Sequence, residues 1–411
     1  MKNNKRYIKG VLILVSCFLS LNTSSQTLQD YLKIAEKNNP RLKAADYNYK
    51  NALEKRGEVH TLPNTEIGVG YFVSEPETRT GAQRFKVSVK QMIPWFGSIT
   101  VRENYRNSLA EVTFENLAIA KRKLIVAISL SYYNLVEIRA KQEVVKENIA
   151  LLKTYEELAL TSLKVGKASA VDVLRLQIRQ NELEQLKKVL EQTYIGEQTL
   201  LNKLLNRKKE TKITVVRNLE IPLNNSLKRN INLKVHPELI QYDKLYASVS
   251  QLEVLNQKES KPMLGFGLDY IAVSERSNMN FSDNGKDIIM PMLSLSIPIF
   301  NKKYTSKTKQ NKFQQLEIKA QKQERLNALE TAFNKAITKR TSAIISYETQ
   351  IKNLGQAKNV EEILRKTYET GIIDFKEVLD IQELQLKIQI NKIEAVKNYY
   401  IQTISINYLS N

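Results

Sequence analysis

The side chains best able to do chemistry are scarce in this sequence of 411 residues. It contains one cysteine, Cys17, and two histidines, His60 and His236, which lie far apart in the chain. A catalytic triad or a His-based metal centre needs more of these residues at closer spacing. A single cysteine also excludes an internal disulfide framework and any Cys-rich zinc site.

Other chemical motifs are absent as well. The glycine pairs Gly68-Val-Gly70 and Gly265-Phe-Gly267 lie in strand-like segments and open no helix, unlike phosphate-binding loops. They fit places where a strand needs small side chains. With no nucleophile–base pair and no metal-ligand spacing in the sequence, we expect no enzyme activity and no cofactor.

Two short polar patterns follow isolated glycines. Ser169-x-x-Asp172 follows Gly166, and Asp374-x-x-Glu377 follows Gly371. A glycine commonly ends a helix in the left-handed conformation, and such a four-residue pattern is a capping box that begins the next helix. The two patterns therefore predict two helix–turn–helix units, and helix capping is one reading of their acidic residues.

Very long helices must flank these turns. The chain has only 13 glycines and 9 prolines, with no proline between Pro94 and Pro222 or after Pro298. Apolar residues recur at spacings of three and four in both stretches, as on a helix face. The first helix of each pair has about 65 residues, on the order of 100 Å at 1.5 Å per residue. A filamentous coiled coil is the simplest alternative, but the strands contradict it.

The strands are recognised by alternation. Phe85, Val87 and Val89 alternate with polar neighbours, and so do the apolar residues of 264–270 and 293–297. This period of two predicts β-strands with one apolar face. Two hairpins result, at about 66–91 and 264–297, each with a polar turn.

The two halves of the chain follow one plan. Pro40 and Pro237, Pro94 and Pro298, and Gly166 and Gly371 form pairs at a nearly constant offset of about 200 residues, which indicates an internal repeat. We expect a signal peptide at 1–25, a first repeat at 26–225 and a second at 226–411. The first has a helix, the hairpin at about 66–91 and helices at about 98–163 and 169–206. The second has helices at about 237–258, 304–368 and 374–409 around the hairpin at about 264–297.

The N-terminus indicates export. Lys2, Lys5, Arg6 and Lys9 precede about 11 mostly apolar residues, and small polar residues follow up to Gln26. This is the pattern of a secretory signal peptide and is too short for a mature membrane-spanning helix. Cleavage near Ser25 is favoured. The alternatives are an uncleaved anchor and a lipobox that ends at Cys17, which would make Cys17 the lipidated first residue.

The expected export of the chain bears on how its net positive charge is interpreted. The net charge of +20 suggests a nucleic-acid binder, but that function does not fit a chain that leaves the cytoplasm. An extracytoplasmic coiled-coil scaffold without a channel fits the helices but not the strands. Four strands of membrane-spanning length cannot close a barrel alone, and open edges cannot face lipid. Three copies would supply twelve strands and enclose a lumen.

These features together resemble the TolC-like outer-membrane efflux proteins. The most specific pieces are the hairpin exits, Gln91-Met-Ile-Pro94-Trp95-Phe-Gly97 and Ser296-Ile-Pro298-Ile-Phe-Asn301. The resemblance covers about residues 27–409, and the Pro-Trp-x-Gly form is most similar to the heavy-metal branch. It implies a mostly α fold with a four-stranded β contribution per chain. Coiled-coil-like helices form an α-barrel, and a trimer shares a 12-stranded transmembrane β-barrel.

The resemblance also implies roles for particular residues. Acidic side chains near the helix turns line the periplasmic entrance in that family, and Asp172, Glu377 and Asp380 match them, while Tyr368 matches a tyrosine of the closing network. Ile372 and Ile373 stand where the family carries a basic partner, with Arg175 and Arg365 as candidates to replace it. The expected adaptor-docking tip comprises Gly166, Val173, Leu174, Gly371, Val378 and Leu379. Pro94, Trp95 and Pro298 mark the barrel–helix junction, where Trp95 serves either an aromatic belt or plain packing.

The implied function is a conduit. A trimer in the outer membrane of a Gram-negative cell would extend into the periplasm, dock on a periplasmic adaptor, and work with an inner-membrane pump for efflux or type I export. Outer-membrane lipid is the other partner, and no nucleic acid is expected. The exported substrate, the pump class and the location of the charge stay open.

Overall fold

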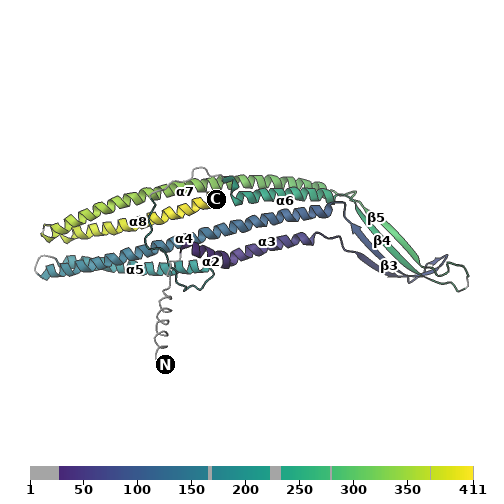
Figure 1. The fold of residues 1–411 in the computed structure, drawn as a ribbon, viewed down its shortest axis with the longest axis horizontal. Coiled ribbons are helices and arrows are strands. Elements are labelled where there is room, and N and C mark those ends of the chain that lie inside the picture. The colour runs from purple at the N-terminus through teal and green to yellow at the C-terminus, as the bar shows by residue number, and fades with distance from the viewer. Residues whose placement is uncertain (1–26, 165–168, 223–232, 278–279, 371, 411) are drawn as a thin grey trace, which may run out of the picture. The chain divides into compact units, whose positions relative to one another are not determined.

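The computed structural model describes residues 27–164, 169–222, 233–277, 280–370 and 372–410. The expected signal peptide, Cys17, Gly166 and Gly371 lie outside these residues. The described chain is mostly helical with a small antiparallel sheet, which confirms the expected class at that level. Figure 1 shows the elements. In order they are α2 (Leu28–Asn38), α3 (Pro40–Glu58), β1 (Glu66–Tyr71), β2 (Glu77–Thr78), β3 (Gly81–Ile93), α4 (Ser98–Lys164), α5 (Ala170–Leu204), η1 (Leu233–Val235), α6 (Pro237–Glu259), β4 (Met263–Ser274), β5 (Ile288–Ser296), α7 (Lys303–Glu369) and α8 (Phe375–Ser410).

Local sequence explains where the short helices begin. Thr27 and Asp30 form a capping box at the start of α2. Pro40 begins α3, and Pro237 begins α6 behind His236, whose Nδ1 accepts the Glu238 N–H at 3.3 Å. Proline suits the first turn of a helix because its missing N–H would have no helical partner there. Among the described residues, no helix is both long enough and apolar enough to cross a membrane.

The sheet has the order β1-β3-β4-β5, and β2 pairs with the start of β3. All of these pairings are antiparallel, with Val69 opposite Val87 and Phe266 opposite Leu293. Five strands therefore occur among the described residues, where we expected four. The additional strand, β2, has two residues and lies in the segment expected to be a polar turn.

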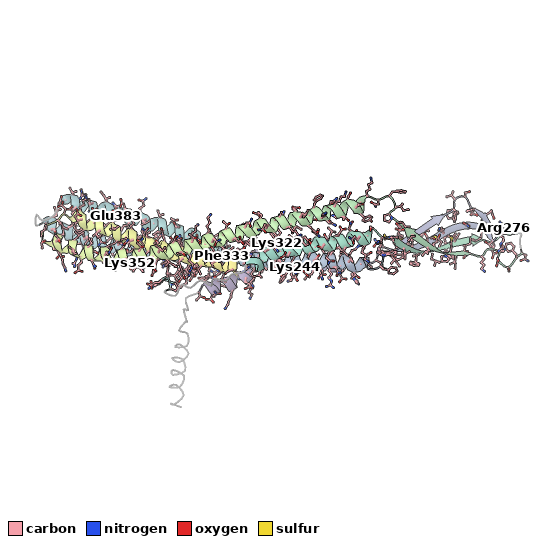
Figure 2. All side chains as sticks on the ribbon, turned by 90° about the horizontal axis from the view of Figure 1, so that it is seen from above. Lys244, Arg276, Lys322, Phe333, Lys352 and Glu383 are labelled. Atoms are coloured by element: carbon pink, nitrogen blue, oxygen red, sulfur yellow. The ribbon has the colours of Figure 1, made fainter. Side chains whose placement is uncertain are left out.

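Ion pairs tie the β2 loop to the loop between β4 and β5. Arg79 pairs with Asp283 at 2.9 Å, and Arg276, labelled in Figure 2, pairs with Glu77 at 2.7 Å. Gly81, the first residue of β3, has a φ of +132°, and an added Cβ there would lie 1.8 Å from the Ser274 carbonyl oxygen. Only glycine fits this close approach, which allows β3 to begin here.

One face of the sheet is apolar and exposed. Its large side chains are Ile67, Val69, Tyr71, Phe266, Leu268, Leu293 and Leu295. The alternate positions mix small and polar residues such as Gly70 and Ser88 with apolar ones such as Ile271 and Met292. Among them, the fully buried Asp269 forms an ion pair with Lys86. Gly265 is crowded, because a Cβ there would approach the Ser294 Oγ to 2.2 Å. The alternation follows the two-residue period of the strands.

The chain divides into two compact units, each drawn from both halves of the sequence. One comprises 1–40, 122–229 and 333–408, and the other comprises 41–121, 230–332 and 409–411. The second unit contains the sheet, and ion pairs connect its helices. Lys244 on α6 pairs with Glu111 on α4 at 2.8 Å, and Lys322 on α7 pairs with Asp243 on α6 at 2.5 Å (Figure 2). The predicted two-repeat organisation stays a prediction.

Candidate functional site

The acidic residues expected at the entrance lie at the starts of α5 and α8. Ser169 caps α5, since its Oγ accepts the Val171 N–H at 3.1 Å and its own N–H donates to the Asp172 carboxylate at 3.3 Å. Asp172 is thus a capping residue, and part of its surface stays accessible. In α8, Glu377 and Asp380 are exposed, and Asp380 lies 3.9 Å from Lys376. These carboxylates can attract cations, whatever their capping role.

Tyr368, near the end of α7, belongs to an aromatic group. Its ring packs against Phe375 with 5.0 Å between centroids, and Phe375 also contacts Tyr155 at 5.8 Å. The Tyr368 hydroxyl is buried and makes no hydrogen bond of good geometry within the described part of the chain. Burial raises the pKa of Tyr368, and the nearby Asp172 carboxylate acts in the same direction. Arg365, a candidate basic partner, forms an ion pair with Glu369 at 3.5 Å.

The residues expected to dock an adaptor divide into two groups. Val173 and Val378 are 7% and 1% exposed and pack in the core formed by α4, α5, α7 and α8. Leu174 is 58% exposed, and Leu379 packs at the edge of this core. The buried pair contributes to packing in this structure, whereas Leu174 presents an apolar surface. Their docking role stays a prediction.

A buried polar network lies beside this core and was not predicted. The Glu361 carboxylate of α7 accepts the Tyr155 hydroxyl of α4 at 3.0 Å and the Gln385 amide of α8 at 2.7 Å. Gln382 of α8 donates to the same carboxylate. Tyr155, Gln382 and Gln385 are each 5–6% exposed. The network therefore joins three helices through one carboxylate.

The electrostatics favour the protonated form of the Tyr155 hydroxyl in this network. Burial, followed by the Glu361 carboxylate to which it donates, raises the pKa of the Tyr155 hydroxyl. Tyr155 therefore remains a donor at physiological pH. A sequence signal for the network existed: Gln382 and Gln385 fall four and seven positions after Val378, on the same helix face as this core residue. Polar residues at such positions indicate a buried polar cluster.

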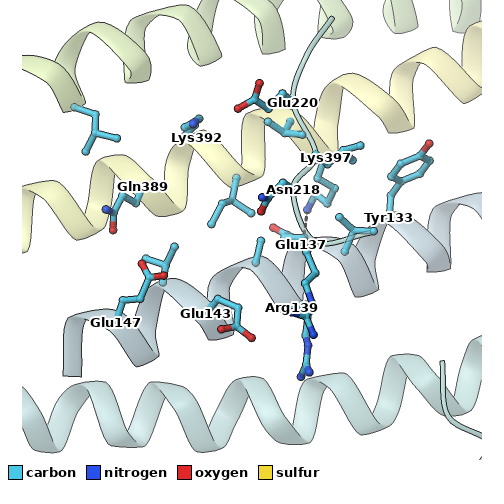
Figure 3. Close-up of a pocket in the computed structure, with 18 residues that line it drawn as sticks. Tyr133, Glu137, Arg139, Glu143, Glu147, Asn218, Glu220, Gln389, Lys392 and Lys397 are labelled. Carbon is cyan, nitrogen blue, oxygen red and sulfur yellow. Dashed lines mark ion pairs between the residues drawn. The ribbon is translucent and has the colours of Figure 1, made fainter. Parts of the chain in front are cut away.

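A cavity of about 460 Å³ opens between α4 and α8, beneath the segment 217–220 (Figure 3). Glu137 in its wall pairs with Lys397 at 2.9 Å and with Lys141 at 3.0 Å. Glu143 and Glu147, one helical turn apart on α4, also line it and are exposed. Charges of both signs line the cavity, which indicates no single class of ligand. Within the described residues no group of three or more His, Cys, Asp or Glu side chains could hold a metal ion.

The junction residues lie between strand and helix. Pro94 is buried and follows the end of β3, and Trp95 packs against Phe96 with 5.9 Å between ring centroids. Gly97 at φ +79° turns the chain into α4. Pro298 stands between β5 and α7 in the same way. Trp95 is half-buried and Phe96 is 73% exposed, so Phe96 is the more accessible ring.

Comparison with known proteins identifies the fold. No protein-family model matches the chain, and no curated protein matches its sequence. Among solved structures, CusC matches with a TM-score of 0.78 and 13% identity, covering 94% of this chain and 93% of CusC, in work describing transmembrane channel formation. The outer membrane protein VceC of Vibrio cholerae matches with a TM-score of 0.75 and 13% identity, over 93% of this chain and 96% of VceC.

A third structure agrees. The MtrE outer membrane channel of Neisseria gonorrhoeae, in its open state, matches with a TM-score of 0.71 and 13% identity, over 93% of this chain and 88% of MtrE. At such low identity the likeness establishes the fold and nothing finer. This chain therefore has the fold of the outer-membrane channel proteins, as its resemblance to the TolC-like proteins implied.

Proposed function

We propose that this chain is an outer-membrane channel of a tripartite efflux or type I export system. Three copies form a conduit across the outer membrane and the periplasm, which docks on a periplasmic adaptor and receives substrate from an inner-membrane pump. The fold shared with CusC, VceC and MtrE supports this proposal. The protein supplies a passage and no chemistry, so the pump supplies the energy.

The observation that carries the proposal is the exposed apolar face of the sheet. Val69 is 77% exposed and Leu293 is 72% exposed, with further large apolar side chains between them. Water-soluble proteins rarely expose a continuous apolar face of this kind, because it promotes aggregation. Lipid is a solvent in which such a face is stable. The opposite face carries charged and small residues such as Lys86 and Ser88, which suit a water-filled lumen, together with some methionines.

The edges of the sheet support assembly into a trimer. β1 and β5 are its outer strands, and each has one unpaired edge in the described chain. A membrane offers no water to these backbone groups, so each edge must pair with another strand. Pairing β5 of one copy with β1 of the next closes the sheet, and three copies give a barrel of twelve strands. The short β2 stays outside this count.

The helix turns suit the periplasmic entrance and the adaptor. Asp172, Glu377 and Asp380 place accessible carboxylates at the starts of α5 and α8, and Leu174 adds an exposed apolar contact. Helical tips of this kind dock through apolar anchors on helical hairpins. The entrance opens when the α7–α8 pair shifts against α4, and this shift breaks the hydrogen bond from Tyr155 to Glu361.

The experiment combines fractionation with a pair of substitutions on neighbouring β1 residues. The wild-type protein should appear in the outer membrane as a trimer that requires detergent. Val69→Glu places a charge on the apolar face and should sharply reduce assembled trimer, because charge on a lipid-facing strand is destabilising. Gly70→Glu places the same charge on the opposite face, where nothing lies within 4 Å and Lys86 lies opposite, and should assemble normally.

The contrary result is equally clear. A water-soluble monomer or dimer in the periplasm would overturn the channel and favour a coiled-coil scaffold. Assembly of the Val69→Glu protein at the wild-type level would show that the apolar face of the sheet does not meet lipid.

A further inference from the structure

The places where strands and helices meet carry an unusual mixture of side chains. We define the junction collar as residues 56–64, 95–106, 255–261 and 297–303, which flank the ends of the four long strands. These segments contain seven Lys or Arg residues and three acidic residues, an excess of four positive charges in each chain. The proposed function, on which this inference rests, places the collar next to the membrane.

Large apolar side chains accompany this charge. Phe300 is fully exposed, Phe96 is 73% exposed and Ile299 is 71% exposed. Aromatic and basic side chains together are typical of the membrane–water interface, where rings lie among the headgroups and cations reach the phosphates. Neither an aqueous lumen nor a helix–helix contact requires a fully exposed phenylalanine beside Lys302 and Lys303.

A cleft of about 570 Å³ lies within the collar. Leu62, Tyr105 and Leu255 contribute apolar and aromatic surface, while Arg102 and Arg106 contribute two cations one helical turn apart on α4. Acidic groups also line the cleft: Glu259 lies 3.4 Å from Arg102, and Glu58 is exposed at its edge.

One acidic residue on the same helix as Arg106 is engaged by other basic residues. Glu103 is bound by Arg56 at 2.6 Å and by His60 at 3.2 Å. Arg106 has no ion-pair partner among the residues that the structure describes, and it is half-buried. An arginine in this position can form two hydrogen bonds with a phosphate.

The direction of α4 and α7 orients the basic side chains of the collar toward the strands. α4 begins at Ser98 and α7 at Lys303, both directly after a strand. The Cα–Cβ bonds of a helix tilt toward its N-terminus, so Arg102, Arg106 and Lys303 lean toward the sheet. Long basic side chains near a membrane extend toward the headgroups in this way.

We propose that the junction collar binds anionic glycerophospholipids, and that the Arg102–Arg106 cleft holds their phosphate. The apolar walls and the exposed rings contact the acyl chains, while the remaining lysines attract the negative surface. Part of the excess positive charge of the chain is thereby assigned to lipid binding. Free phosphate shares the headgroup chemistry but would gain nothing from the apolar surface.

The test measures lipids retained by the purified trimer in native mass spectrometry. Phosphatidylglycerol and phosphatidylethanolamine with identical acyl chains are supplied together. The wild type should retain phosphatidylglycerol about tenfold over phosphatidylethanolamine. Arg102→Gln/Arg106→Gln should lose most of this preference. The matched control, Lys352→Gln/Lys358→Gln, removes two exposed cations of α7 outside the collar and should keep it.

A second variant and a competition experiment complete the test. Should Arg102→Gln/Arg106→Gln fail to form trimers, Lys302→Gln/Lys303→Gln replaces exposed residues at the start of α7 and should reduce the preference by itself. Millimolar inorganic phosphate should not displace the retained lipid. The proposal is overturned if the wild type shows no preference, if the control loses as much as the collar variant, or if phosphate alone displaces the lipid.

Planar-bilayer recordings on the same preparations separate this inference from the proposed function. Channels without a lipid preference would overturn the collar alone. A lipid preference without channels would overturn the channel and leave the lipid site in place.

Discussion

The Glu361 network makes the sharpest prediction about opening. One carboxylate on α7 accepts hydrogen bonds from Tyr155 on α4 and from Gln382 and Gln385 on α8. Replacing Glu361 with leucine keeps the volume of the side chain and removes the acceptor. The contact between α4 and the α7–α8 pair should weaken, and the channel should open more readily.

The magnitude follows from the groups left behind. Gln385 keeps a hydrogen bond to the Ala357 carbonyl oxygen at 3.1 Å, whereas Tyr155 and Gln382 lose their main acceptor. A buried donor without a partner costs about 1–3 kcal/mol. Gln382 can still donate to the Tyr155 oxygen at 3.4 Å, which lowers the cost. The main bond of this network from α4 to the α7–α8 pair is that of Tyr155, so we expect the closed arrangement to lose about 1–3 kcal/mol relative to the open one. A loss of about 2 kcal/mol already shifts an opening equilibrium roughly 30-fold.

Two measurements on the reconstituted trimer check this. Single-channel recordings report the open fraction, and hydrogen–deuterium exchange reports the protection of α8. The matched control is Glu362→Leu, one position away, which removes an exposed ion pair with Lys366 at 2.8 Å. Such a surface pair contributes about 0–1 kcal/mol, so the control should behave like the wild type.

Two results would refute the reasoning. If Glu361→Leu leaves the protection of α8 unchanged, the network does not hold these helices together. If protection falls but the open fraction matches that of Glu362→Leu, the network stabilises the fold and has no part in opening.

Three further predictions concern other ionisable groups. Alanine at Glu377 and Asp380 should weaken block by multivalent cations in planar bilayers, because two accessible carboxylates are lost; unchanged block would remove them from the entrance. Arg325→Met removes an ion-pair partner from the buried Glu238 carboxylate. The substitution should lower the stability of the folded chain by about 2 kcal/mol, a value between those for exposed and buried ion pairs. This loss should appear as faster hydrogen exchange in α6, and exchange at the wild-type rate would contradict the prediction. Hydrogen bonds from two glutamine side chains hold the pKa of Glu156 below its ordinary value of 4.5. The ionised Glu156 therefore stabilises the fold above pH 4.5, and this stabilisation is lost as the pH falls through the lowered pKa. Glu156→Gln should remove this part of the acid sensitivity of the α4–α5 pair in acid titrations followed by hydrogen exchange, and an unchanged acid midpoint would contradict it.

The sequence allowed the helices and strands to be recognised because their signals are local. Proline marks the strand-to-helix passages, and the absence of proline permits α4 to run over Ser98–Lys164, where the sequence predicts about 98–163. Alternation over 264–270 reveals a strand because neighbouring side chains point to opposite faces. β2 could not be found this way. It depends on Gly81 passing close to the Ser274 carbonyl oxygen, a contact across almost two hundred residues.

The candidate site was less predictable, because burial depends on neighbours that are distant in sequence. Val173 and Leu174 are adjacent and similar in type, yet one is buried and the other exposed. The Glu361 network was overlooked for the same reason, since a glutamate on a charged helix resembles any surface residue until its partners are known. Gln382 and Gln385, which share a helix face with the core residue Val378, were the only sequence signal of the network that we identified.

The most direct test of the account is the conductance of the purified mature protein in a planar lipid bilayer. We predict discrete single-channel steps from a trimeric preparation and no steps from the Val69→Glu protein, whose sheet cannot face lipid. A correctly folded trimer that inserts into the bilayer and conducts no ions under any condition, including with the Glu361→Leu substitution, would contradict the claim that this chain forms a channel.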